Sequence, residues 1–170
     1  IARIPETGTA ALGAVGMCFP IVILITAFTN MFGSGGAPLF SISRGARNRK
    51  EASMIQNTSF FLLSAAALIL TITGELTGYP ILRVFGTSDR AMVHALPYLR
   101  IYLIGTVFSM IATGMNPFIT AQGYAMTGMT TVIIGAAANI ILDPLMIFVL
   151  GLGVEGAAIA TILSQALSAV

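Results

Sequence analysis

Long apolar stretches recur along this chain, and they constrain its fold more than any single motif. They reach or exceed the roughly 20 residues that a helix needs to cross a bilayer. Gly, Pro and Ser occur inside them, which is typical of packed transmembrane helices and not of the alternating strands of a β-barrel. Charged residues make up 8% of the chain, against roughly 25% in a soluble domain. The sequence therefore predicts an all-α, polytopic membrane helix bundle.

About five transmembrane helices are expected. The first exceeds the thickness of a bilayer, so it must tilt, kink or protrude. Gly33 to Pro38 inside it favours close helix packing. The second should end where Glu75 precedes Gly78 and Pro80, and Ser88 or Asp89 should cap the third. In order, the predicted ranges are about 8–43, 52–74, 90–121, 126–150 and from 154 onward.

Charge is concentrated between the first two helices, in the cluster of Arg44, Arg47, Arg49 and Lys50. By the positive-inside rule this connector is cytoplasmic, and residue 1 starts outside. The cluster is too small and too local for a nucleic-acid surface. Cys18 is the only cysteine, so neither an internal disulfide nor a cysteine metal site is expected.

Asp143 is the only charged residue between Met126 and Leu150. A carboxylate at this depth costs roughly 2.5 to 3.5 kcal/mol and usually faces a cavity or a partner. Asn139 shares its helical face, and Pro144 frees the carbonyl of Ile140 because proline has no N–H. Two interpretations stay open, which are an ion site and a structural hydrogen bond between helices.

Two other polar features accompany Asp143. Asn116 precedes Pro117 and either packs between helices or faces a polar cavity. The fifth helix carries one small, weakly polar face, which we expect beside Asn139 and Asp143 because only the 151–153 connection separates the fourth and fifth helices. That face consists of Ala157, Thr161, Ser164 and Ser168.

An enzyme is disfavoured by the absence of a Ser-His-Asp set, a metal-ligand cluster and a nucleotide-binding loop from the sequence. No catalytic, cofactor-binding or metal-binding residue is predicted. His94 lies near a membrane interface and is assigned no role.

Three passages resemble the multidrug and toxin extrusion (MATE) transporters. They are Gly35-Gly36-Ala37-Pro38-Leu39-Phe40-Ser41-Ile42-Ser43-Arg44-Gly45-Ala46, Asn139-Ile140-Ile141-Leu142-Asp143-Pro144-Leu145-Met146-Ile147-Phe148 and Gly151-Leu152-Gly153-Val154-Glu155-Gly156-Ala157-Ala158-Ile159-Ala160-Thr161. The resemblance covers essentially all of residues 1–170. It implies a partial amino-terminal lobe, similar to the second through sixth helices of a twelve-helix, two-lobed transporter. The connector 122–127 departs from the commoner Gln-Gly-Asn type.

This resemblance implies an antiporter of a prokaryotic inner (plasma) membrane that exports organic, often cationic drugs by alternating access. The coupling ion would be H⁺ or Na⁺, with no cofactor. Asn139, Asp143 and Thr161 match the family's coupling-cation network. The expected partners are small organic substrates, the lipid bilayer and the remaining helices of a longer transporter, with no nucleic acid. The acidic residue of the family's first helix has no counterpart here.

Two alternatives remain. Related folds handle amphiphiles, so a flippase for a lipid-linked or other amphiphilic substrate is the second hypothesis. A membrane scaffold is the third, and it would leave Asp143 without a role.

Overall fold

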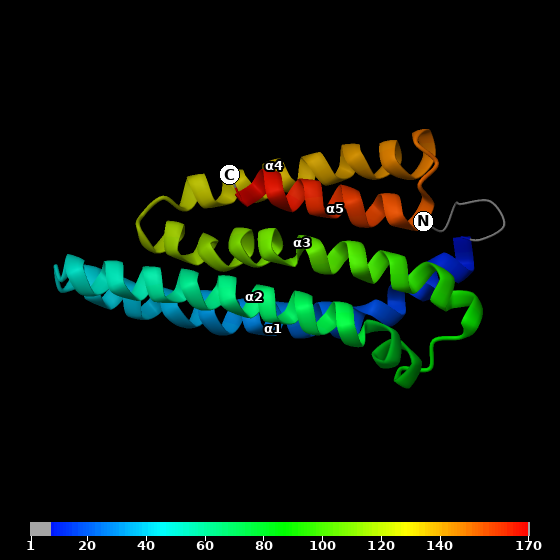
Figure 1. The fold of residues 1–170 in the computed structure, drawn as a ribbon. Coiled ribbons are helices and arrows are strands. Elements are labelled where there is room, and N and C mark those ends of the chain that lie inside the picture. The colour runs from blue at the N-terminus through cyan, green and yellow to red at the C-terminus, as the bar shows by residue number, and fades with distance from the viewer. Residues whose placement is uncertain (1–7, 170) are drawn as a thin grey trace.

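The computed structural model describes residues 8–169, which form helices joined by short connections (Figure 1). No strand occurs within that range, and the all-α class is confirmed. Residue 1 and Arg3, on which the orientation also depends, lie outside the described residues. The elements are α1 (Gly8–Gly45), α2 (Arg49–Val84), α3 (Asp89–Ala121), α4 (Ala125–Pro144), the π-helix η1 (Leu145–Val149) and α5 (Gly153–Ala169).

Four helices of the described range are long and apolar enough to cross a membrane, namely α1, α2, α3 and the combined run of α4 with η1. The fifth, α5, has 17 residues, which is at the short end of the lengths that span a bilayer. The chain is therefore a multi-pass membrane protein, as the sequence predicted.

The central element is α3, which packs against α1, α2, α4 and α5 (Figure 1). On one of its sides α1 and α2 form a long hairpin, and on the other lie α4 and α5. The turns from α1 to α2 and from α3 to α4 lie at one end of the bundle, and the other connections lie at the opposite end. The fourth and fifth helices are antiparallel neighbours, as the short connection predicted.

Small residues let these helices approach closely. A Cβ atom added to Gly33 of α1 would lie 2.7 Å from the Cα atom of Gly114 of α3, and one added to Gly105 would collide with Ile162 of α5. The interpretation of the 33–38 cluster as a packing surface is confirmed at Gly33. Neither Pro20 nor Pro38 interrupts α1, which is continuous from Gly8 to Gly45.

The prediction that the second helix ends near Gly74 was wrong, because α2 continues to Val84. Gly74 and Gly78 are not helix breakers here. A Cβ atom at Gly74 would lie 2.7 Å from a methyl group of Leu103, and one at Gly78 would lie 3.3 Å from a methyl group of Leu99. Both glycines therefore make room for leucines of α3, and Glu75 lies inside a helix rather than at its end.

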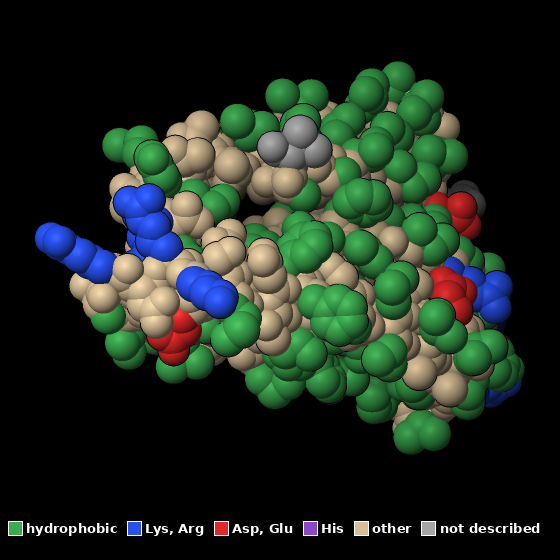
Figure 2. Space-filling model, turned by 60° about the vertical axis from the view of Figure 1, so that its left-hand side comes forward, with side chains coloured by type: hydrophobic (Ala, Val, Ile, Leu, Met, Phe, Trp, Pro, Cys, Tyr) green, Lys and Arg blue, Asp and Glu red, His purple; other side chains and the backbone are tan. Residues whose placement is uncertain are grey.

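The surface of the bundle is mostly hydrophobic along its length (Figure 2). Many large apolar side chains are exposed on it, among them Phe61, Ile72 and Ile140. Lys and Arg side chains gather at the end that holds the α1–α2 turn (Figure 2). This distribution suits helices that face lipid along their sides and water at their ends.

Candidate functional site

Asp143 lies at the carboxyl end of α4, directly before Pro144. Its Oδ1 atom is buried and has no hydrogen-bond partner among the described residues. The salt bridges in the same part of the chain join Arg83 to Asp89 and Arg100 to Glu75, so Asp143 has no basic partner there. A buried, unpartnered carboxylate oxygen is costly, and it marks a place where a proton or a cation would be stabilised.

The helix changes its hydrogen-bonding pattern immediately after Asp143. The π-helix η1 begins at Leu145, and the Leu150 amide donates to the Leu145 carbonyl at 3.0 Å. Gly156 of α5 packs closely against this segment, because a Cβ atom added to Gly156 would lie 2.7 Å from the Met146 carbonyl oxygen. The sequence predicted that Pro144 frees the carbonyl of Ile140, but it did not predict a π-helix. Such single turns are frequent at functional sites because they re-aim side chains.

A cleft of about 240 Å³ lies between α3, α4 and α5, beside the helical face that carries Asp143. Its lining contains no charged residue. Asn139 of α4 faces the polar side of α5 across this cleft, as the spacing predicted. The polar residues that line it are Thr113, Asn139, Thr161, Ser164, Gln165 and Ser168.

The hydroxyl groups in this cleft already donate their protons. Thr161 donates to the Ala157 carbonyl at 2.9 Å, and Ser164 donates to the Ala160 carbonyl at 2.7 Å. Ser168 crosses to α4 and donates to the Thr131 carbonyl at 3.0 Å. Each oxygen keeps lone pairs that can accept a further bond. The cleft is thus rich in acceptors, which is the chemistry that a hard cation or a protonated group requires.

Asn139 and Thr161 are brought together in this cleft, whereas Asp143 lies one helical turn beyond Asn139 and does not line it. Sequence reasoning gave no role to Tyr98 of α3, which packs against the hydrophobic core of the bundle. Its ring stacks on Tyr102, with centroids 6.2 Å apart. Two tyrosines four residues apart in an apolar helix were the available signal, since a phenol in such a place usually has a polar partner.

Asn116 connects α3 to the first turns of α4. Its Nδ2 atom donates to the Gly128 carbonyl at 2.8 Å and to the Thr131 hydroxyl at 3.2 Å. Gly128 allows this approach, because an added Cβ would lie 3.0 Å from Asn116 Oδ1. These contacts fit the packing interpretation. The alternative, that Asn116 faces a polar cavity, stays a prediction.

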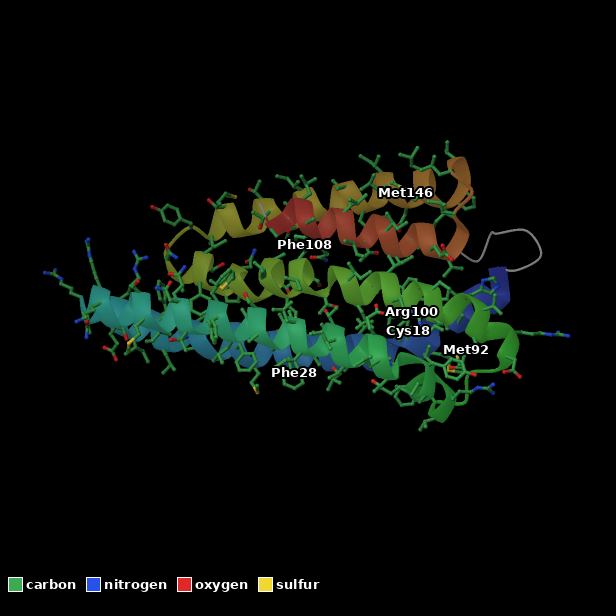
Figure 3. The ribbon with its side chains drawn as sticks, in the orientation of Figure 1. Cys18, Phe28, Met92, Arg100, Phe108 and Met146 are labelled. Atoms are coloured by element: carbon green, nitrogen blue, oxygen red, sulfur yellow. The ribbon has the colours of Figure 1, made fainter. Side chains whose placement is uncertain are left out.

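Cys18 lies where α1 passes α3 (Figure 3). Its buried thiol contacts the carbonyl oxygens of Ala14 and Ala95, at 3.5 and 3.6 Å. Within residues 8–169 no group of three or more His, Cys, Asp and Glu side chains could hold a metal ion.

The family model described as MatE matches residues 2–145. The chain belongs to the MatE family. That match covers most of the sequence and identifies a family of transporters, in agreement with the resemblance, although the third passage at 151–161 lies beyond the matched residues.

Among MatE relatives, the chain is similar to the multidrug export protein MepA of Staphylococcus haemolyticus, with 28% identity over 157 residues. The match covers 92% of this chain and 35% of that protein. It is also 25% identical to the FAD transporter of Shewanella oneidensis, over 95% of this chain and 36% of that protein. The chain thus spans about a third of the length of these relatives.

A crystal structure of MATE in the bent conformation has the same arrangement, with a TM-score of 0.90 and 30% identity. The match covers 95% of this chain and 37% of that one. The helix bundle described above is therefore a MATE fold over nearly its whole length.

Proposed function

We propose that this chain forms the ion-coupling part of a longer transporter that exports organic, often cationic drugs in exchange for H⁺ or Na⁺ by alternating access. In this proposal Asp143 exchanges the ion, and Asn139 and Thr161 support it with oxygen ligands. The family membership and the multidrug export relatives support drug efflux.

One observation carries the ion-coupling role. The Oδ1 atom of Asp143 is buried without a hydrogen-bond partner in the described residues, at a helix break beside an acceptor-lined cleft. Glu75 also has one such oxygen, but its other oxygen lies 3.6 Å from Arg100, whereas Asp143 has no basic partner among the described residues. A proton or Na⁺ arriving from the cleft would satisfy Asp143 instead.

The same atoms suit either ion. A proton would neutralise the carboxylate and let it donate to a neighbouring oxygen. Na⁺ would take several oxygen ligands, and the carboxylate, the Asn139 amide oxygen and the Thr161 hydroxyl offer them. Substrate and ion then bind in alternation if each favours a different state of the transporter.

The test is ethidium efflux from proteoliposomes by the intact transporter that carries this chain, with a pH gradient and a Na⁺ gradient imposed separately. We expect efflux under at least one gradient in the wild type and its loss in Asp143→Asn. The matched control is Asp89→Asn, because Asp89 is exposed and paired with Arg83 at 2.8 Å. Normal, gradient-dependent efflux in folded Asp143→Asn would refute the ion-exchange role.

The kinship with an FAD transporter favours a second candidate, namely movement of a large amphiphile. This candidate corresponds to the second hypothesis from the sequence, a flippase for a lipid-linked or other amphiphilic substrate. Transport of flavin adenine dinucleotide (FAD) or of a lipid precursor, with no ethidium efflux under either gradient, would favour this candidate. The ion-coupling role of Asp143 would then be tested with that substrate.

A further inference from the structure

A hollow of about 670 Å³ opens at the end of the bundle where α1 ends, α2 begins and α3 ends. It lies at the opposite end of α3 from Tyr98 and belongs to no part of the ion site. Its apolar side holds Phe40 and Ala52, and its polar lining consists of Arg44, Arg47, Arg49, Ser53, Gln56 and Gln122.

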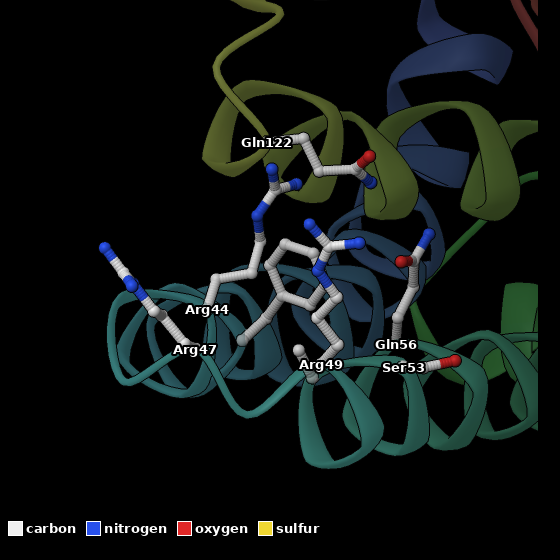
Figure 4. A pocket seen from close by; sticks show the side chains of 8 residues that line it. Arg44, Arg47, Arg49, Ser53, Gln56 and Gln122 are labelled. Carbon is white, nitrogen blue, oxygen red and sulfur yellow. The ribbon is translucent and has the colours of Figure 1, made fainter.

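The short turn between α1 and α2 places two arginines beside each other. The backbone N–H of Asn48 donates to the Ser43 carbonyl at 2.9 Å and closes this turn. Figure 4 shows Arg44 and Arg49 both extending toward Gln122 of α3, whereas Arg47 extends away from them. The Arg44 guanidinium lies over the Phe40 ring, 5.8 Å from its centroid, which holds the side chain in place.

The positive charge of this hollow is not neutralised within the described residues. Neither Arg44 nor Arg49 takes part in the salt bridges of residues 8–169, and no acidic residue lines the hollow. The nearby Glu51 accepts from the Asn48 side chain at 2.8 Å, does not line the hollow and takes part in neither of those salt bridges. The amino end of α2 adds the positive end of its helix dipole.

The surroundings of the hollow are those of a membrane interface. Large apolar side chains such as Leu39 of α1 and Met54 of α2 are exposed on these two helices, which are long and apolar enough to span a bilayer. An occupant with an anionic group and an apolar tail would match both surfaces. Basic pockets between transmembrane helices on the cytoplasmic side bind anionic lipid headgroups for this reason.

We propose that this hollow binds the phosphate of an anionic phospholipid, held by Arg44 and Arg49 with amide donors from Gln56 and Gln122. Arginine pairs with phosphate through two parallel N–H bonds, and the side-chain amides donate to the remaining oxygens. The acyl chains extend from the hollow into the surrounding bilayer. This inference does not depend on the proposed drug efflux.

The test is native mass spectrometry of the intact transporter in detergent micelles, titrated with phosphatidylglycerol and, separately, with phosphatidylcholine. Phosphatidylglycerol should bind more tightly than phosphatidylcholine. Arg44→Gln and Arg49→Gln should each lower the affinity for phosphatidylglycerol about fivefold. Lys50→Gln is the matched control, because it removes the same charge from the same turn but does not line the hollow.

Two further arms decide the assignment. Arg44→Lys and Arg49→Lys keep the charge and should weaken phosphatidylglycerol less than the Gln variants do, with unchanged helical circular dichroism confirming the fold. Inorganic phosphate should not displace the lipid at equal concentration. Equal loss in Lys50→Gln, no preference over phosphatidylcholine, or displacement by inorganic phosphate would each overturn the proposal.

Discussion

Glu75 and Asp143 are both carboxylates inside helices long enough to span the membrane, and each has one buried oxygen without a hydrogen-bond partner in the described chain. They differ in their second oxygen. Glu75 Oε2 lies 3.6 Å from Nε of Arg100, so a fixed cation compensates its charge. Asp143 has no such partner among these residues, and it lies beside an acceptor-lined cleft.

Under the proposed function, this difference separates a structural carboxylate, Glu75, from an exchangeable one, Asp143. A fixed arginine keeps a carboxylate charged and joins two helices, here α2 and α3. A carboxylate without a fixed partner changes its state when a mobile cation arrives or leaves. Fold alone does not distinguish the two, but the neighbouring side chains do.

The largest expected effect is a contrast in efflux between Asp143→Asn and Glu75→Gln in the intact transporter. Asn cannot bind or release a proton, so gradient-driven ethidium efflux should fall by at least about tenfold in Asp143→Asn. Glu75→Gln should keep most of its efflux per folded molecule. Equal losses in the two variants, measured in proteoliposomes at matched protein content, would erase the distinction.

The next effect concerns the π-helix that follows Asp143. Gly156→Ala adds a Cβ only 2.7 Å from the Met146 carbonyl oxygen, so the backbone of η1 or α5 must shift. We expect a destabilisation of about 1 to 3 kcal/mol, together with weaker ion coupling. Thermal unfolding followed by circular dichroism measures the first effect, and efflux measures the second.

Gly16→Ala is the control for that substitution, because a Cβ at Gly16 of α1 meets no atom within 4 Å. It should leave both readouts unchanged or raise stability slightly, since alanine favours helices. Equal behaviour of the two variants would show that α5 does not hold the π-helix in place.

A smaller effect is expected for the Glu75–Arg100 pair. The side chains are 32% and 56% exposed, so breaking the pair with Glu75→Gln should cost only about 1 kcal/mol. Combining it with Arg100→Gln should restore most of this loss, because no unpaired charge then remains. The midpoint of thermal unfolding measures the stability of each variant. A double variant less stable than either single variant would contradict the pairing.

The smallest effect belongs to a supporting ligand. Thr161→Val removes the hydroxyl oxygen that faces Asn139 across the cleft and should weaken coupling-ion affinity by about 0.5 to 1 kcal/mol, a two- to fivefold change. Thr161→Ser keeps that oxygen and should bind the ion nearly as well as the wild type. Ion dependence of efflux measures both, and indistinguishable Val and Ser variants would remove Thr161 from the site.

Hydrophobic run lengths were enough to predict the all-α fold and the membrane location, because the cost of burying backbone groups in lipid leaves few alternatives to helices. The cap at Ser88 was also predictable, since its side chain accepts from the Ala91 amide. The end of α2 was not. From the sequence alone, Gly74 and Gly78 predict a helix end. In the structure they lie inside α2, where Leu103 and Leu99 of α3 pack against them.

The site was predictable only in part. Helical spacing placed Asn139 on one face of α4 and Thr161 on the facing side of α5, and the cleft contains both. The placement of Tyr98 was not predicted, because its packing against the core depends on how α3 crosses its neighbours and not on any local pattern. The π-helix was not predicted either, because Pro144 indicates a lost hydrogen bond but not how the chain compensates for it.

We propose that Asp143 carries an ion that the substrate displaces. This is tested by counting the protons released, or the radioactive Na⁺ ions displaced, when saturating ethidium is added to the purified intact transporter. We expect Asp143→Asn to release one ion fewer per transporter than the wild type, and Glu75→Gln to release as many. Equal ion release from the wild type and Asp143→Asn, with ethidium bound to both, would contradict it.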